Sequence, residues 1–193
     1  IDRIQAADDA YVAGFSSLCG GLPAPEACDN PLLYKFSWSP AGVMSASQNA
    51  ARYRKDGETV VVEGEQLLSS AIPVSDAFRA LSLEELPNRD SIDPYAELYG
   101  IQDTAETVYR GTLRYKGWSA LMDSFRAAGL SSKTAGEFRV ETLPATWPEL
   151  MGSELVDAKQ LTDEAIDCLA WLGCFDPAEE VAGGRGEGTV LGA

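Results

Sequence analysis

Two short segments of this chain combine arginines with small polar residues and are well suited to bind an acidic ligand. Arg89 lies in the run Pro87-Asn-Arg-Asp-Ser91, and Arg110 and Arg114 lie in Arg110-Gly-Thr-Leu-Arg-Tyr115. A guanidinium group matches a carboxylate with two parallel hydrogen bonds. Arg110 and Arg114 are four residues apart, so on a strand they face the same side. The sequence predicts a carboxylate-binding cluster, with ordinary ion pairing to Asp or Glu as the alternative.

Polar and aromatic side chains accompany these arginines. Asn88 and Thr112 belong to the same two segments. Ser37 and Trp38 lie in Leu32-Leu-Tyr-Lys-Phe-Ser-Trp-Ser-Pro40, where aromatic residues alternate with polar ones. On an extended backbone this alternation gives one aromatic face and one polar face. It predicts either an apolar wall beside an oriented serine or an ordinary half-buried strand.

A glycine pair, Gly20-Gly21, precedes a proline-rich stretch. It would let the backbone approach a ligand closely with exposed N–H donors, or it would form only a tight turn. Cys19 is the thiol nearest these motifs, although most lone cysteines are small core residues. The four cysteines lack zinc-site spacing, and we expect reduced thiols in an intracellular protein, cytoplasmic or mitochondrial.

Composition excludes several classes of function. The net charge is −15, from 30 acidic and 15 basic residues, so nucleic acid is not an expected partner. No apolar run approaches the ~18 residues of a membrane span. The chain contains no histidine, which removes Ser-His and Cys-His nucleophilic machinery, and we expect no metal site.

The pattern of the chain predicts an α/β (α+β) fold with a mixed β-sheet, flanking helices and a small, mainly helical C-terminal part. We expect strands at 15–19, 58–63 and 106–115, an ambiguous segment at 78–86, and helices at 1–12, 39–56, 65–71, 93–99, 116–130, 146–151 and 161–175. Because the chain opens on Ile1 within a helical pattern, we expect it to be a fragment of a longer protein.

Three parts follow from this pattern. Residues 1–116 form the predicted α/β core, 117–180 a helical subdomain, and 181–193 a glycine-rich tail or linker. The tail contains no G-x-G-x-x-G and no strand precedes it, so we do not interpret it as a phosphate-binding loop. We therefore expect no Rossmann domain and no cofactor-binding residues in this chain.

Six segments, in order, resemble the saccharopine dehydrogenases of the glutamate-forming type, including the C-terminal half of bifunctional aminoadipate-semialdehyde synthases. The segments are Cys19-Gly-Gly-Leu-Pro-Ala-Pro-Glu26, Asp29-Asn-Pro31, Tyr34-Lys-Phe-Ser-Trp-Ser39, Pro87-Asn-Arg-Asp-Ser91, Arg110-Gly-Thr-Leu-Arg-Tyr115 and Trp171-Leu-Gly173.

The resemblance implies an inserted substrate-binding and dimerisation domain, with NAD or NADP bound by a Rossmann domain absent from this chain. The parent enzyme would oxidise saccharopine with NAD(P)+ to glutamate and aminoadipate semialdehyde, as a homodimer in lysine metabolism. The fragment alone would be inactive, with no catalytic residue of its own. The implied substrate contacts are Ser37, Asn88, Arg89 and Arg110, followed by Gly20, Trp38 and Thr112.

Two alternatives remain open. The same fold would serve as a non-catalytic module for dimerisation or amino-acid sensing, which the missing cofactor domain favours. A related C–N oxidoreductase would instead act on a carboxylated polyamine, with fewer arginines directed into the cleft.

Overall fold

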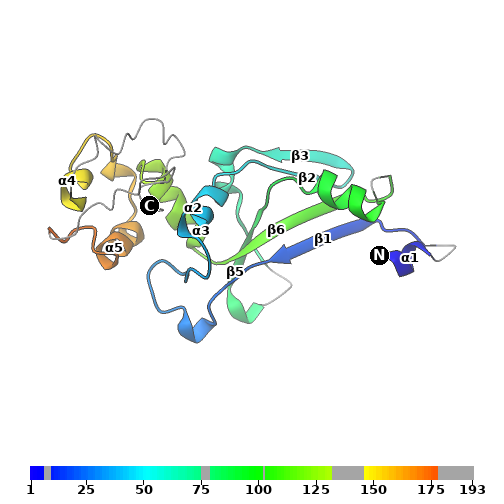
Figure 1. Ribbon diagram of the computed structural model, residues 1–193, viewed down its shortest axis with the longest axis horizontal. Coiled ribbons are helices and arrows are strands. Elements are labelled where there is room, and N and C mark those ends of the chain that lie inside the picture. Colours follow the sequence, from blue (N-terminus) through cyan, green and yellow to red (C-terminus); the bar gives the residue numbers. More distant parts are fainter. Residues whose placement is uncertain (7–9, 75–78, 102, 132–145, 178–193) are drawn as a thin grey trace. The chain divides into compact units, whose positions relative to one another are not determined.

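The computed structural model describes residues 1–6, 10–74, 79–101, 103–131 and 146–177 (Figure 1). Its strands are β1 (Gly14–Cys19), β2 (Ala51–Lys55), β3 (Glu58–Val62), β4 (Ile72–Pro73), β5 (Leu83–Pro87) and β6 (Thr107–Tyr115). Its α-helices are α1 (Asp2–Gln5), α2 (Pro40–Ala46), α3 (Trp118–Ala127), α4 (Trp147–Met151) and α5 (Asp163–Trp171). Short 3-10 turns and one π-helical turn, η5 (Asp93–Glu97), connect them.

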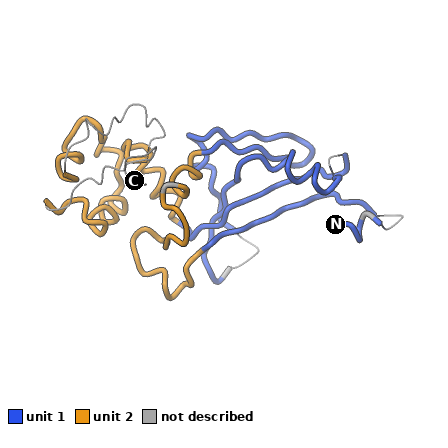
Figure 2. The backbone as a smooth tube through the Cα atoms, viewed as in Figure 1, with its two compact units in different colours: residues 1–21, 49–116 blue, residues 22–48, 117–193 orange. Residues whose placement is uncertain are grey.

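The chain divides into two compact units, each built from two separate stretches of sequence (Figure 2). Unit 1 contains residues 1–21 and 49–116, and unit 2 contains residues 22–48 and 117–193. The sequence grouped 22–48 with the sheet, whereas in the structure Tyr34 packs on Trp118 of α3, with ring centroids 6.3 Å apart. The predicted tail, 181–193, lies outside the described residues.

The nine-residue strand β6 is the central element of unit 1. It pairs with β1 in parallel along residues 107–112 and with β5 in antiparallel along residues 111–115. Strand β2 joins β6 through Arg54 and Val108, and carries β3 as the outer strand of a hairpin. The strand order is β3-β2-β6-β5-β4, with β1 on β6 off this path. The predicted mixed sheet with flanking helices is confirmed.

Two predicted helices end earlier than expected: the helix over 1–12 ends at Gln5, and the second case is instructive. The expected helix over 39–56 begins correctly, because Ser39 caps α2 by accepting a hydrogen bond from the Gly42 amide, but it ends at Ala46. Asp56 and Gly57, taken as the helix stop, instead form the turn of the β2–β3 hairpin, both with positive φ. An Asp-Gly pair between β-branched and aromatic residues is a strong hairpin signal.

Each unit has its own apolar interior. In unit 1, the helical segment 92–99 covers β1 and β6. Its Ile92 and Ala96, and Ile101 just after it, are buried against Val108. In unit 2, Trp118, Met122 and Phe125 of α3 are buried together with Cys168 and Leu169 of α5, and within each helix these residues lie at helical spacing on one face. The Ser124 hydroxyl donates to the Gln160 carbonyl and accepts from the Thr162 amide, joining the two helices.

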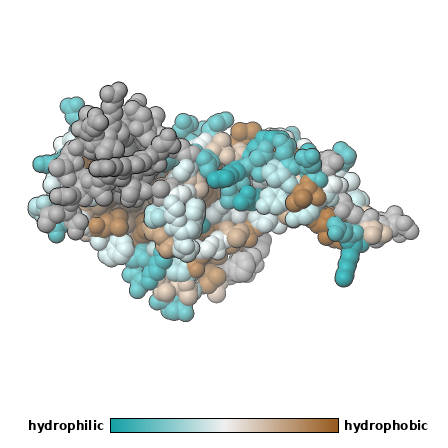
Figure 3. All heavy atoms as spheres, in the orientation of Figure 1, coloured by the Kyte–Doolittle hydropathy of each residue, from teal (hydrophilic) through white to brown (hydrophobic). Residues whose placement is uncertain are grey.

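The described helices are short. Even α3, with ten residues, cannot cross a membrane, which takes about 20 apolar residues. On the face seen in Figure 3, apolar residues lie in small separate groups among polar ones.

The interior of unit 1 leads to a stability prediction. Ile101→Ala removes a side chain with no exposed area, so we expect a loss of about 2–5 kcal/mol in the free energy of unfolding. Chemical denaturation measures this loss. Leu98→Ala is the matched control, because Leu98 lies nearby in the helical segment 92–99 but is 72% exposed, and its effect should stay within about 0.5 kcal/mol. Equal effects of the two substitutions would contradict the assigned core.

Candidate functional site

A polar row on one face of β6 holds two of the residues that the sequence singled out. Side chains of a strand alternate between its faces, so Arg110 and Thr112 share a face. Ser17 and Cys19 of β1 are their register partners and extend the row sideways. The row is thus made by the alternation of β6 and by its parallel pairing with β1.

The turn after β5 brings Asn88 to this row. The Asn88 amide donates to the Arg110 carbonyl at 2.9 Å, and the Arg110 amide donates to the Ser91 hydroxyl oxygen at 3.0 Å. The Asn88 side chain donates to the Thr112 hydroxyl oxygen at 2.7 Å. Because Thr112 accepts this bond, its own hydroxyl proton remains available for an acceptor such as a carboxylate.

Arg110 is half-buried and lies against an aromatic cluster formed by Phe15, Tyr95 and Tyr99. Its guanidinium carbon is 6.0 Å from the centre of the Tyr95 ring, within reach of a cation–π contact. Tyr95 stacks on Phe15, with ring centroids 5.4 Å apart. Among the residues that the structure describes, Arg110 has no carboxylate partner. Its charge is therefore held beside an apolar wall, where an anionic ligand would be attracted strongly.

Arg89 is exposed and also has no carboxylate partner within the described ranges. Its backbone is left-handed, with φ of 54°. This conformation is uncommon for any residue other than glycine. The arginine therefore lies at the tip of a tightly turned segment, where its side chain is accessible to solvent.

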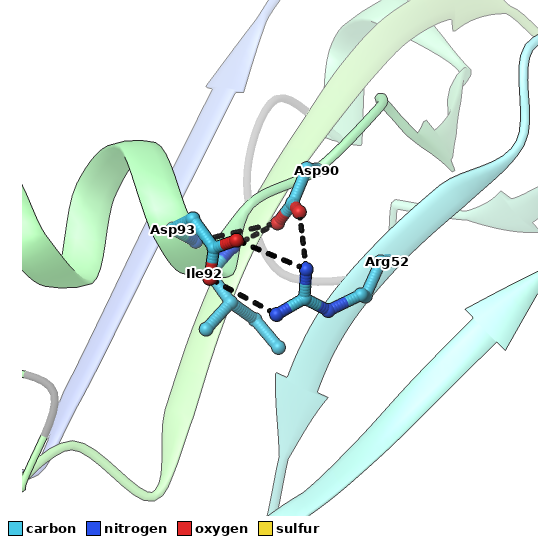
Figure 4. A network of polar contacts seen from close by, with 4 residues as sticks. All are labelled: Arg52, Asp90, Ile92 and Asp93. Atoms are coloured by element: carbon cyan, nitrogen blue, oxygen red, sulfur yellow. Dashed lines mark hydrogen bonds and ion pairs between the residues drawn. The ribbon is translucent and has the colours of Figure 1, made fainter.

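Arg52 of β2 holds that turn in place by its backbone and by its side chain. The Arg52 amide donates to the Arg89 carbonyl at 3.0 Å, and the Arg52 carbonyl accepts from the Ser91 amide at 2.7 Å. The Arg52 guanidinium pairs with Asp90 at 2.5 Å and with Asp93 at 3.0 Å (Figure 4). These hydrogen bonds and charges raise the pKa of Arg52, the bond to Asp93 most of all.

Asp90 has a second task in the same network. Its other carboxylate oxygen accepts from the Ile92 amide at 2.8 Å and from the Asp93 amide at 3.3 Å (Figure 4). These are free N–H groups at the start of the helical segment 92–99, which a capping carboxylate satisfies. Sequence reasoning missed Arg52 and Asp90 as supports of the turn. The only local signal was an acidic residue placed just before a helix start.

Arg114, the third arginine of the sequence motifs, belongs to the interior of the sheet. Its residue is only 7% exposed, and it donates to the Leu113 carbonyl at 2.8 Å. Its register partner on β5 is Glu84, which is also buried. This position favours a structural role for Arg114 over contact with a ligand.

Gly20 is required by close packing. A Cβ atom built at this position would lie 2.7 Å from the Leu113 carbonyl oxygen and 2.9 Å from the Leu113 Cβ. Real Cβ atoms do not approach backbone so closely, so only glycine fits where the chain leaves β1. This backbone constraint explains the glycine, and a contact with a ligand remains a prediction.

Ser37 and Trp38 belong to unit 2, whereas the other predicted contacts belong to unit 1. Their segment is not a strand. Tyr34 is buried and its ring meets that of Phe36 edge to face, with centroids 5.2 Å apart, but Phe36 is 41% and Trp38 51% exposed. The Trp38 ring packs on Gly42, where an added Cβ would lie 2.4 Å from it. The ring thus covers the start of α2, and Ser37 beside it is exposed.

The remaining chemistry of the described residues is sparse. All four cysteines are free thiols, and burial raises the pKa of Cys168 to about 11, which keeps it unreactive. In the ranges that the structure describes, no three Cys, Asp or Glu side chains gather as a metal site would require.

Comparison with known proteins gives a consistent result. The sequence profile of the family "Saccharopine dehydrogenase C-terminal domain" matches residues 1–182. Mouse mitochondrial alpha-aminoadipic semialdehyde synthase is 48% identical over 143 residues, which cover 74% of this chain and 15% of the mouse protein. Saccharopine dehydrogenase [NADP(+), L-glutamate-forming] of Saccharomyces cerevisiae is 35% identical over 211 residues, covering 97% of this chain and 46% of the yeast protein.

A solved structure agrees with these sequence matches. Apo saccharopine dehydrogenase (L-Glu forming) from Saccharomyces cerevisiae matches 98% of this chain with a TM-score of 0.79 and 32% identity. The match covers 45% of the yeast chain. The chain therefore spans less than half the length of these relatives.

The network around Arg52 leads to a local prediction. Arg52→Met keeps the aliphatic stem but removes both ion pairs, so the 88–91 turn should open more often. We expect the Ser91 amide, which donates to the Arg52 carbonyl, to exchange its hydrogen several-fold faster in an NMR exchange measurement.

Arg126→Met is the matched control for Arg52→Met. It breaks a similar ion pair with Asp123 in unit 2, at 2.8 Å, and should leave the exchange of the Ser91 amide unchanged. Equal protection of Ser91 in Arg52→Met and the unmodified protein would mean that backbone bonds alone hold the turn.

Proposed function

This chain belongs to the saccharopine dehydrogenase family, as its C-terminal domain, and from that premise we propose that it is the substrate-binding part of a longer, glutamate-forming saccharopine dehydrogenase. The proposed ligand is saccharopine, in which glutamate and lysine share one secondary amine and three carboxylates are present. The observation that carries the proposal is that Arg89 and Arg110 have no carboxylate partner among the described residues.

The polar row offers complementary groups for such a ligand. Arg110 supplies a guanidinium fork beside the Tyr95 ring, and the Thr112 hydroxyl supplies a donor that Asn88 orients. Arg89 supplies a second fork on the adjoining turn. A ligand with several carboxylates would engage more than one of these groups at once, which favours a multi-carboxylate ligand over a singly charged one. Gly20, Ser37 and Trp38 stay as further proposed contacts.

The turn after β1 does not have the form of a dinucleotide fingerprint. Strand β1 is followed by Gly20-Gly21 and then by Pro23 and Pro25, which begins a 3-10 turn instead of a helix. A dinucleotide fingerprint instead needs a glycine-rich turn that opens directly into a helix. We propose that NAD or NADP binds elsewhere in the longer protein, so that this chain alone is inactive. We also propose that the longer protein is a homodimer. Its proposed location is intracellular, in the cytoplasm or in mitochondria; the name of the mouse relative states a mitochondrial location for that protein.

Kinetics of the full-length protein that contains this chain test the proposal. Arg110→Gln should lower kcat/KM for saccharopine by about 10- to 100-fold, because a carboxylate loses a charge-assisted hydrogen-bond partner. Lys116→Gln removes the same charge just beyond β6 from an exposed residue, and should leave kcat/KM unchanged. An Arg110 variant with the same affinity for saccharopine would exclude this residue from the site.

The same assay separates the other candidate functions. A dimerisation or sensing module would bind an amino acid without turning over saccharopine. An oxidoreductase for a carboxylated polyamine would prefer that substrate in a panel of secondary amines.

A further inference from the structure

Unit 1 contains a cavity of about 350 Å³ that the proposed saccharopine site does not use. Its wall includes residues from six elements of unit 1: Ser16, Tyr53, Ser70, Ile72, Glu85 and Tyr109. The volume lies within the range of small-molecule sites, and the wall combines aromatic rings with a few polar groups, as such sites do.

The cavity lies on the opposite face of the sheet from the polar row. Tyr109 directly precedes Arg110 on β6, so their side chains project to opposite faces. Ser16 is the register partner of Tyr109, and Glu85 is the register partner of Leu113, which shares a face with Tyr109. Arg110 and Thr112 therefore cannot contribute to this cavity. It is a separate site with its own chemistry.

Glu85 is a carboxylate in the cavity wall to which a cationic ligand could bind. Its side chain is half-buried, and burial raises the pKa of its carboxyl group. Within the described residues it makes no hydrogen bond and no ion pair. A partly desolvated carboxylate without a partner is unfavourable in the free protein, and a bound cation would relieve that cost.

The other charged residues of the wall do not fill this role. The Arg54 guanidinium donates to the Ala105 carbonyl at 3.0 Å. Lys55 and Asp56 are exposed neighbours of opposite charge, and no ion pair joins Lys55 to Glu85 in the described part of the chain. Glu85 is thus the one half-buried carboxylate of the wall, and its field is not offset by a paired cation among the described residues.

Two tyrosines form an aromatic surface next to Glu85. The rings of Tyr53 and Tyr109 meet edge to face, with centroids 5.1 Å apart. Burial, followed by the charge of Glu85, raises the pKa of Tyr109, so its phenol stays neutral and can donate a hydrogen bond. Aromatic faces attract ammonium ions, especially where water is excluded.

We propose that this cavity binds a small organic ammonium ion, with Glu85 as its counter-ion and Tyr53 and Tyr109 as its aromatic wall. Ser16 and Ser70 add hydroxyl groups that can accept from the ammonium hydrogens. The proposal is independent of saccharopine binding, because it depends on the other face of the sheet.

Calorimetric titration of the full-length protein with n-butylammonium chloride tests the site, with butan-1-ol as the neutral analogue of similar size. We expect saturable binding of butylammonium in the millimolar range, as suits a ligand of few heavy atoms, and no saturable binding of butan-1-ol. Glu85→Gln should weaken butylammonium binding at least about tenfold, because the ammonium group loses a charge-assisted hydrogen bond. Glu58→Gln, which changes an exposed carboxylate outside the cavity wall, should leave it unchanged.

One further variant, Arg110→Gln, and a stability measurement on Glu85→Gln make the result decisive. Arg110→Gln should bind butylammonium like the unmodified protein. If Arg110→Gln lost this binding while Glu85→Gln kept it, the amine would bind at the polar row, and the proposal would be overturned. Equal binding of butan-1-ol, or no binding of butylammonium, as when a second copy of the chain covers the cavity, would also overturn it. Glu85→Gln should be at least as stable to heat as the unmodified protein, because it removes a half-buried charge, so weaker binding would not reflect unfolding.

Discussion

In unit 1 of this strongly acidic chain, Arg89 and Arg110 have no acidic partner among the described residues, and the arrangement of the 88–93 segment accounts for this. Asp90 directly follows Arg89 in sequence, and would be its nearest partner. Arg52 instead pairs with Asp90 and with Asp93, and the second oxygen of Asp90 accepts from the amides at the start of the helical segment 92–99. One arginine of β2 thus occupies both carboxylates, which leaves Arg89 and Arg110 without a carboxylate partner in the described part of the chain.

The net charge of −15 does not prevent an anionic ligand from binding next to these groups. At physiological ionic strength, charges at a solvated surface are screened beyond about 8 Å. A contact between a guanidinium fork and a carboxylate acts at hydrogen-bonding distance, and the Tyr95 ring beside Arg110 reduces local screening further. The net charge of the chain therefore opposes the approach of an anion only weakly, and the affinity for an anion depends on contacts with the polar row. This balance favours ligands that present several carboxylates to several donors.

The sequence predicted what depends on local patterns and missed what depends on long-range pairing. The alternation of residues 106–115 predicted β6, and with it that Arg110 and Arg114 face the same side, because a strand fixes both. The helix α3 followed from the pattern of residues 116–130 in the same way. The hairpin at Asp56 and Gly57 was taken for a helix end, since a short turn motif suits either structure. The contacts of Arg52 join residues 38 and 41 positions apart, and nothing in a local pattern encodes such a pair.

The backbone of Arg89 ties this pairing to the proposed function. A left-handed conformation costs a residue with a side chain roughly 1–2 kcal/mol, and glycine or asparagine would adopt it with less strain. The turn retains arginine, and the surrounding bonds compensate: the carbonyl of Arg89 and the amide of Ser91 both bond to Arg52, and Ser91 in turn accepts from Arg110. Strain of this kind persists where the side chain is needed for something other than folding. An exposed arginine without a carboxylate partner in the described chain contributes little to stability. The proposed role of Arg89, binding a ligand carboxylate, gives a reason for arginine at this strained position.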